Sequence, residues 1–433
     1  MLERRSVFPG SKRLPRQRPV DTFPFQTKRF SWRQLLCALP FSGFLKRGII
    51  GPEWNRAYTS AYDSVVSFPL IARLVPVLLF TALTVSGAAT QTAGRTRNVI
   101  FVMTDGLRWQ EVFQGADSAL MNKESGVPDV EALKREYWRD TPAARREALL
   151  PFLWSVVARN GQIYGNRDAG SDAYLTNGLN FSYPGYSETL CGFADPRVDS
   201  NDPTPNPNVT VLEWLHNKPA YRGKVAAFGA WNVISAIVNA GRAGFPVNSG
   251  YDPYTVPPSS PRMELLNRLK EETRVWNAEP FDAFTFHTAL EHLKQHKPRV
   301  LFLSLGETDE WSHDGRYALY LKAAARVDRY LKELWETVQS MPEYRGTTSL
   351  VFAVDHGRGR APVEWRSHGQ KVPESKYVWM AFMGPGIPAL GERKDAPAVT
   401  QSQVAATVAA LLGEDYSGDV QKAGKPIADV LPR

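Results

Sequence analysis

The sequence predicts an α/β fold in which a mostly parallel sheet is sandwiched between helices. The first observation is a set of short runs that are apolar throughout and contain many β-branched residues, which is typical of strands buried on both faces. The second is that segments with helical apolar spacing alternate with these runs. The third is that an aspartate follows three of the runs, and such sheets bind ligands beyond the carboxyl ends of their strands.

A local pattern justifies each predicted element. The apolar runs predict five strands, over 98–104, 224–229, 299–305, 348–354 and 377–382. Helical spacing, proline at a start or glycine at an end predicts seven helices, over 151–161, 209–215, 233–240, 262–274, 281–296, 317–341 and 403–412. Residues 107–150 are charged and irregular and are interpreted as an insertion, and residues 241–262, rich in Gly, Pro, Ser and Asn, are interpreted as a long loop or part of a cap. We therefore expect insertions near 107–150 and 241–295.

The positive charge of the chain is confined to its N-terminal segment. The 433 residues carry a formal charge of +8. Residues 1–66 contain 12 of the 52 Lys and Arg and 4 of the 44 Asp and Glu, so the rest of the chain contains 40 of each. The part expected to fold is neutral, which gives no case for a nucleic-acid partner. No obligate protein partner is indicated either.

The N-terminal segment has two parts. Residues 1–66 mix Arg, Pro and aromatic residues without a sustained period, and are predicted to be disordered. In 67–92, Arg73 precedes an apolar run of about a dozen residues that ends in small residues, which is typical of a secretory signal peptide. The run is short for a membrane span, which needs about 20 apolar residues.

We therefore predict an exported protein, periplasmic or extracellular, with its folded domain over 93–433. The alternative is a membrane anchor through 74–89 with a basic cytoplasmic tail. Because signal peptides begin at the N-terminus, our hypothesis is that translation starts downstream of Met1 and that residues 1–66 are not translated.

Cysteine usage is sparse. Cys37 and Cys191 are the only cysteines, so removal of the leader would leave no pair for an intramolecular disulfide. An exported enzyme of this size needs none. Cys191 stands in an apolar run and is interpreted as a small core residue.

Acidic residues and histidines gather at the predicted strand ends. Asp105, Asp309 and Asp355 each follow a strand, and histidines stand at positions 313, 356 and 368. Asp and His together suit zinc, and two ions about 3.5–4 Å apart need six or seven ligands. Each pattern alone also fits a helix cap or a turn, but their combination predicts a metal centre. Three other histidines are expected on the solvated face of helix 281–296: His287, His292 and His296.

Ser182 is the candidate nucleophile. It opens the run Ser182-Tyr183-Pro184-Gly185, and proline near the start of a helix predicts that a helix begins at or beside Ser182. Free N–H groups and the helix dipole favour negative charge there, as attack on a phosphate or sulfate requires. An ordinary capping serine would occupy the same place. The acidic and histidine motifs on either side of Ser182 favour the nucleophile.

The order of these motifs resembles the alkaline phosphatase superfamily, and within it the nucleotide pyrophosphatase/phosphodiesterase branch. The matching motifs are Met103-Thr104-Asp105-Gly106, Ser182-Tyr183-Pro184, Asp309-Glu310-Trp311-Ser312-His313, Asp355-His356-Gly357 and His368-Gly369. The resemblance implies an alkaline phosphatase-like α/β/α fold with cap insertions.

The resemblance also implies two divalent metal ions, expected to be zinc, and their ligands. One ion would take Asp309, His313 and His368. The other would take Asp105, Asp355, His356 and the oxygen of Ser182.

The chain departs from the family pattern in several places. Gly185 stands where the diesterases place an asparagine, and the candidates for that contact are Asn177, Asn180 and Asn232. No motif identifies the phosphate-binding arginine, for which the candidates are Arg366, Arg358 and Arg108. Of these, Asn232 and Arg366 are predicted as substrate-binding residues. Sulfatases carry a Cys-x-Pro-x-Arg motif, which Cys191-Gly192-Phe193 does not match.

The sequence therefore predicts a metal-dependent hydrolase of small phosphoric esters, either a phosphomonoesterase or a phosphodiesterase, with Ser182 as nucleophile. One alternative is a phosphoryl transferase or mutase of the same superfamily. The mutases carry a large inserted domain after the serine, whereas here core strands and helices are predicted between Ser182 and Asp309. The other alternative is a catalytically inactive metal-binding protein, against which the complete ligand set argues.

Overall fold

The computed structural model describes residues 95–432. The predicted leader (1–66) and the predicted signal peptide (67–92) lie outside these residues and stay predictions. No helix within 95–432 has the length and hydropathy that a membrane crossing requires.

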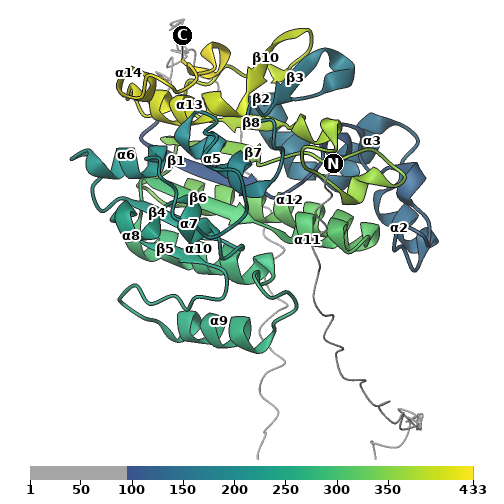
Figure 1. The fold of residues 1–433 in the computed structure, drawn as a ribbon, viewed down its shortest axis with the longest axis horizontal. Coiled ribbons are helices and arrows are strands. Elements are labelled where there is room, and N and C mark those ends of the chain that lie inside the picture. The colour runs from purple at the N-terminus through teal and green to yellow at the C-terminus, as the bar shows by residue number, and fades with distance from the viewer. Residues whose placement is uncertain (1–94, 433) are drawn as a thin grey trace, which may run out of the picture. The chain divides into compact units, whose positions relative to one another are not determined.

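An eight-stranded sheet forms the centre of the fold (Figure 1), in the order β5-β4-β6-β1-β7-β8-β2-β9. Its strands are β1 Asn98–Thr104, β2 Gly161–Tyr164, β4 Val225–Gly229, β5 Val247–Ser249, β6 Val300–Leu305, β7 Thr348–Val354, β8 Met380–Met383 and β9 Gly391–Glu392. The five strands predicted from apolar runs are all present: β1 and β7 have the predicted bounds, and the ends of β4, β6 and β8 are shifted by one to three residues. β5, β2 and β9 were not predicted.

The sheet is mostly parallel. The first five strands in this order, β5-β4-β6-β1-β7, are parallel to one another. β8 runs antiparallel to both of its partners, β7 and β2. In the central strand, Val102 lies between Leu303 of β6 and Phe352 of β7. Every residue of β1, β6 and β7 is buried, as the uniformly apolar runs predicted.

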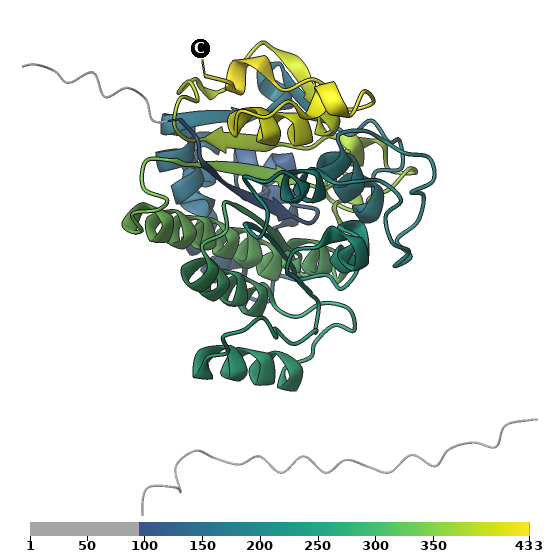
Figure 2. The same cartoon turned by 90° about the vertical axis from the view of Figure 1, so that its left-hand side faces the viewer.

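Two groups of helices flank this sheet. The helices are α1 Trp109–Gln114, α2 Val130–Tyr137, α3 Pro142–Leu149, α4 Ala158–Asn160, α5 Ser182–Cys191, α6 Val211–Asn217, α7 Ile234–Ile237, α8 Ala240–Ala243, α9 Pro261–Glu272, α10 Asp282–His296, α11 Glu307–His313, α12 Tyr317–Ser340, α13 Val404–Leu411 and α14 Tyr416–Asp419. In Figure 2 the strands lie between α13 above and α10 and α12 below. The predicted α/β class is therefore confirmed.

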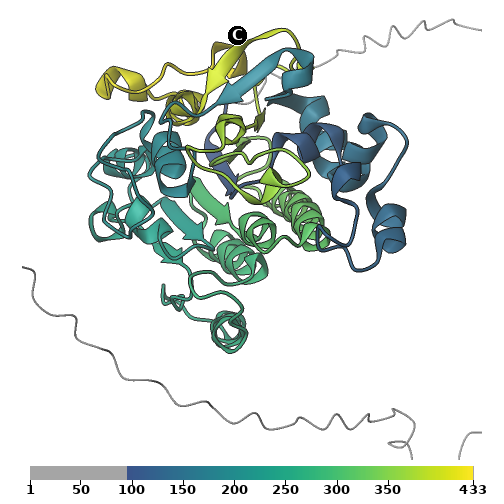
Figure 3. The same cartoon turned by 45° about the vertical axis from the view of Figure 1, so that its right-hand side comes forward.

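A second, two-stranded sheet lies beside the main one. It pairs β3 Ser171–Tyr174 with β10 Ala396–Thr400 in parallel, and Figure 3 shows the two strands side by side. Neither strand has a long apolar run, so the sequence pattern did not indicate them.

Three local predictions were wrong. Residues 107–150 contain α1, α2 and α3 and are not irregular. The signals were present in the N-cap residues Asp129 and Thr141, whose side chains accept from the backbone N–H groups at the starts of α2 and α3. The predicted loop over 241–262 contains β5, a three-residue strand too short to give a pattern.

His292 was wrongly expected to be solvated. It is 2% exposed and its Nδ1 lies 2.7 Å from the hydroxyl oxygen of Tyr254. Burial lowers its pKa to about 3, so it is a neutral core residue.

The helix predicted over 151–161 is present and contains a π-helical segment, Leu153–Val157. Its start is capped from a distance. Asp328 on α12 is 2% exposed, and its two carboxylate oxygens accept from the backbone N–H groups of Phe152 and Leu153, at 2.8 Å each. This contact attaches α12 to the segment that leads into β2.

We expect Asp328→Ala to lower the free energy of unfolding by about 1–3 kcal/mol, because two buried N–H groups lose their acceptors. Asp328→Asn keeps one acceptor and should cost less. Urea unfolding of the three proteins measures this, and equal stability of Asp328→Ala and wild type would contradict the capping role.

Burial also raises the pKa of Asp328 from 3.8 to about 6. The folded protein therefore retains a proton that the unfolded chain releases between these values. The stability of wild type relative to Asp328→Asn should decrease as the pH rises from 3.8 to about 6 and then level off. Urea unfolding at several pH values tests the sign, and a difference that grows with pH would contradict it.

Candidate active site

Two aspartates meet where the adjacent parallel strands β1 and β7 end. Asp105 follows β1 and Asp355 follows β7, and the backbone N–H of Gly106 donates to Asp355 Oδ1 at 3.0 Å. Asp105 is 5% exposed and Asp355 is fully buried. The parallel register thus places two carboxylates side by side, as their positions after the strands predicted.

The third aspartate comes from the helix that follows β6. Asp309 and His313 lie on α11 and face the same way, because residues four apart share a helix face. Asp309 Oδ2 is 3.0 Å from His313 Nε2. The predicted D-x-x-x-H motif is therefore a helical pair.

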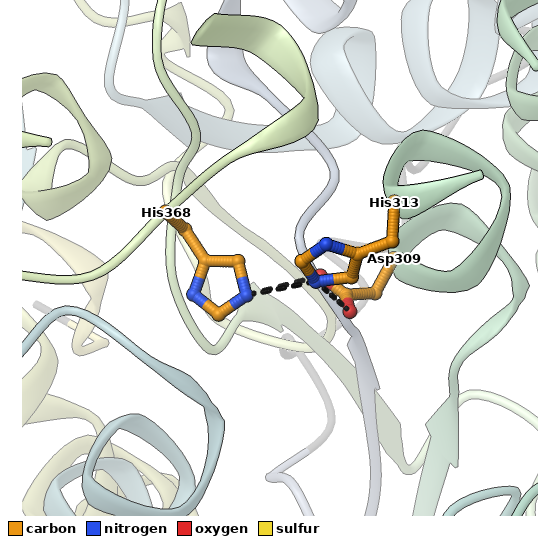
Figure 4. Close-up of side chains that lie close together, drawn as sticks. All are labelled: Asp309, His313 and His368. Atoms are coloured by element: carbon orange, nitrogen blue, oxygen red, sulfur yellow. Dashed lines mark hydrogen bonds and ion pairs between the residues drawn. The ribbon is translucent and has the colours of Figure 1, made fainter. Parts of the chain in front are cut away.

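Two further histidines complete the cluster. His356 is fully buried; its Nδ1 lies 2.9 Å from the backbone oxygen of Gly357, which leaves Nε2 as the acceptor. This Nε2 is 3.2 Å from Asp105 Oδ1. His368 stacks on His356 with 3.9 Å between ring centroids. In Figure 4 the ring of His368 faces that of His313, with 3.0 Å between their Nε2 atoms, beside Asp309.

Ser182 is the first residue of α5, and its hydroxyl points at this cluster. Its Oγ lies 3.2 Å from His356 Nε2 and donates to Asp105 Oδ1 at 3.5 Å. Phe181 occupies the N-cap position, and no side chain caps the helix. The interpretation of Ser182 as a capping serine is therefore wrong.

The cluster provides two sets of metal-ligating atoms. Asp309, His313 and His368 form one set, and Asp105, Asp309 and His356 form the other, with the ligand atoms of each set within 4.8 Å of one another. Asp355 Oδ2, 3.4 Å from His356 Nε2, is buried and has no hydrogen-bond partner within residues 95–432.

The electrostatics of the cluster fit divalent cations. Burial, and then repulsion from neighbouring carboxylates, raises the pKa of Asp105 and of Asp355 well above the ordinary value. Burial lowers the pKa of His368 to about 2, so its imidazole is neutral. Buried carboxylates that repel each other, an Asp355 oxygen without a partner within the described residues and the neutral imidazole of His368 are what bound cations would stabilise.

The remaining site predictions are placed as follows. Arg108 is fully buried, and its guanidinium donates to the carboxylate of Glu111. Arg366, two positions before His368, is half-buried; its Nη2 donates to the Glu124 carbonyl at 2.7 Å. Asn232 is exposed, and no hydrogen bond among residues 95–432 joins its side chain to the cluster.

Among the three asparagine candidates, Asn180 lies nearest the cluster. Its backbone oxygen is 3.4 Å from His368 Nδ1, and its Oδ1 is buried without a partner within the described residues. Asn177 instead uses its amide to bind Glu188 and the backbone of the same loop. Gly185 is explained by packing, because a Cβ there would overlap the Asp355 carbonyl oxygen.

Sequence analysis missed Glu279. It is 4% exposed, and burial, followed by repulsion from Glu310 and Asp105, raises its pKa well above the ordinary value. A Cβ on Gly306, which precedes α11, would overlap Glu279 Oε1. Glu279 belongs to no motif, and only the glycine after β6 hinted that another side chain fills this space.

The comparisons with known proteins bear on the fold. No family model matches the chain, and a search of curated proteins finds no match. Among solved structures, alkaline phosphatase PafA aligns with a TM-score of 0.51 at 12% identity, over 78% of this chain and 99% of that one. The chain has the alkaline phosphatase fold.

Other structures align over similar lengths. The lipoteichoic acid synthase LtaP from Listeria monocytogenes has a TM-score of 0.49 at 13% identity, over 75% of this chain and 74% of that one. A 2-O GAG sulfatase has a TM-score of 0.47 at 15% identity, over 78% and 74%.

We expect Gly185→Ala to displace Asp355, because the new Cβ has no space beside its carbonyl group. The free energy of unfolding should fall by about 1–3 kcal/mol, the usual cost of overpacking, and the purified protein should bind less divalent metal. Gly241→Ala, on α8 with no atom nearer than 4.0 Å, is the matched control. Urea unfolding and metal analysis measure both effects, and equal values for the two variants would contradict the packing argument.

Proposed function

We propose that this protein is a metal-dependent hydrolase of phosphoric esters, a phosphomonoesterase or phosphodiesterase, with Ser182 as nucleophile. The observation that carries the proposal is the placement of Ser182. Its hydroxyl stands at the start of a ten-residue helix, is not used as a cap, and contacts His356 and Asp105. The residues proposed to act with Ser182 are the aspartates and histidines that the sequence motifs identify.

The residues fit two divalent ions, which we propose are zinc. Asp309, His313 and His368 would hold one; Asp105, Asp355, His356 and Ser182 Oγ would hold the other. Bound there, the ions would supply Lewis-acid chemistry, which polarises phosphoryl oxygens and favours the deprotonated nucleophile.

The chain's own residues then account for the covalent steps. Ser182 Oγ attacks phosphorus, the bond to the leaving oxygen breaks, and the proton of Ser182 passes through solvent to that leaving oxygen, which gives a phosphoseryl or nucleotidyl-seryl intermediate. Water then attacks phosphorus, the bond to Oγ breaks, and the proton that the water loses passes to Ser182 Oγ. The N-terminus of α5 favours the negative charge on Oγ throughout.

A cavity lined by Arg366, two residues before His368 in the chain, is the proposed space for the rest of the substrate. It measures about 320 Å³ and is lined by Asn122, Glu124, Ser125, Pro362, Val363 and Arg366. Arg366 Nε has no hydrogen-bond partner within residues 95–432. Arg366 therefore remains our proposed substrate-binding arginine, whereas the exposed Asn232 has weaker support.

Two observations favour phosphate-ester hydrolysis over its alternatives. Cys191 is the last residue of α5, at the opposite end from Ser182, and is fully buried, so it does not serve as a sulfatase-type nucleophile. Between Ser182 and Asp309 the chain adds β4, β5 and β6 to the same central sheet, which does not fit the separate inserted domain of a mutase. We further propose export, or anchoring through 74–89, and small-molecule substrates without nucleic-acid or obligate protein partners.

Removal of the Ser182 hydroxyl should abolish turnover. We expect Ser182→Ala to lower the rate on p-nitrophenyl phosphate or bis-p-nitrophenyl phosphate by about 10⁴-fold or more, the scale on which nucleophile removal acts. Ser187→Ala is the control, because Ser187 lies on the same helix with its hydroxyl toward Cys191. Activity that survives in Ser182→Ala would refute the mechanism, and the ratio of the two wild-type rates assigns monoesterase or diesterase.

Removal of metal should have two effects. Dialysis against EDTA should abolish hydrolysis and lower the melting temperature, because the buried carboxylates lose the cations that stabilise them. Zn²⁺ should restore both. A purified protein without bound metal, or with hydrolysis unaffected by EDTA, would contradict the proposal.

A further inference from the structure

A buried arginine lies against the aspartate that both metal-ligand sets contain. Arg358 follows the Asp355-His356-Gly357 turn after β7 and is 1% exposed. Its Nη2 contacts Asp309 Oδ1 and also donates to the backbone oxygen of Asp309 at 3.2 Å. With no exposed side-chain surface, this guanidinium does not line a substrate pocket.

The chain leaves space for this contact. Gly106 follows Asp105 with a φ of +60°, and a Cβ there would lie 2.7 Å from Asp309 Oδ1 and 2.8 Å from Arg358 Nε. The absence of a side chain at 106 therefore lets Arg358 reach Asp309 behind the cluster.

Because of this contact, the two carboxylate oxygens of Asp309 have different neighbours. Oδ2 lies 3.0 Å from His313 Nε2. Oδ1 contacts Arg358 and also lies 3.8 Å from His356 Nε2 and 3.9 Å from His368 Nε2, within reach of both ligand sets. A guanidinium on Oδ1 competes with any cation there, because both require the same lone pairs.

Another carboxylate oxygen is available to the second ligand set in place of Asp309 Oδ1. Asp355 Oδ2 is buried, has no partner within residues 95–432 and lies 3.4 Å from His356 Nε2. With Oδ1 of Asp309 taken, Asp355 supplies the carboxylate that the second set needs.

We propose that Arg358 is a positioning residue that keeps Asp309 from being shared between the two metal ions. It binds Oδ1 and leaves Oδ2 for the ion of His313 and His368. This inference rests on the two-metal site proposed above, and names a residue that controls how its ligands are divided.

The substitution Arg358→Met removes the guanidinium. It thereby frees Oδ1 of Asp309 and removes a positive charge that competes with a metal ion. We expect the more weakly bound ion to bind at least about tenfold more tightly, the fold-change that corresponds to about 1.4 kcal/mol. The metal-free variant should melt at a lower temperature than metal-free wild type, because Asp309 loses its buried partner. Metal should therefore raise the melting temperature of the variant by more than that of wild type.

The experiment is a titration of metal-free protein with Zn²⁺ against a competing chelator, with the visible absorption of Co²⁺-loaded protein as a report on coordination. Arg358→Lys keeps the charge and should bind the ions with affinities close to wild type. Arg360→Met, whose side chain is 63% exposed and pairs with Glu374, is the matched control. If metal-free Arg358→Met does not fold, chelator competition on the metal-loaded variant gives the same affinity.

The outcomes separate the two proposals. Wild type that binds two ions, with unchanged or weaker binding in Arg358→Met, would overturn the role of Arg358 alone. Unchanged Co²⁺ absorption would do the same. Wild type that binds no metal would overturn the two-metal site itself.

Discussion

The convergence of three aspartates at one edge of the sheet, two of them buried, is the constraint on which the rest of this structure depends. Asp105 and Asp355 are forced together because β1 and β7 are parallel neighbours that end in register. Burial and repulsion raise the pKa of both, so the protein stabilises this edge only by neutralising it. The protein supplies the guanidinium of Arg358 and imidazoles, and one oxygen of Asp355 still has no partner in the part of the chain that the structure describes.

Neighbouring backbone features are adapted to this constraint. Gly106 donates its N–H to Asp355 and leaves space for Arg358. Gly185 brings the first turn of α5 against the Asp355 carbonyl group, and this close approach places Ser182 on the cluster. A diesterase-type asparagine at position 185 would push the helix away. The departure from the family motif is thus a consequence of how closely α5 packs here.

The sequence predicted the parts of the fold and of the candidate site that depend on local patterns. Strands buried on both faces have uniformly apolar sequences, so β1, β6 and β7 and the aspartates beyond them were found. Short elements such as β5 give no period, and α2 and α3 fully bury only Leu133, Tyr137 and Leu149, so both kinds of element were missed. His292 shares a helix with the half-buried His287 and His296, and its packing against Tyr254, which is distant in sequence, makes it a core residue.

Side chains that reach the site from outside the motifs could not be predicted for a different reason. The ends of the Arg358 and Glu279 side chains occupy space that Gly106 and Gly306 leave open, and these glycines are distant in sequence from the residues they accommodate. The two residues approach the Asp309 helix from different segments, Arg358 after β7 and Glu279 before α10. Against the effect of burial, Arg358, with a smaller contribution from His313, lowers the pKa of Asp309 well below its ordinary value, which keeps this carboxylate charged. Any cation bound at Asp309 therefore competes with a guanidinium that is already in place.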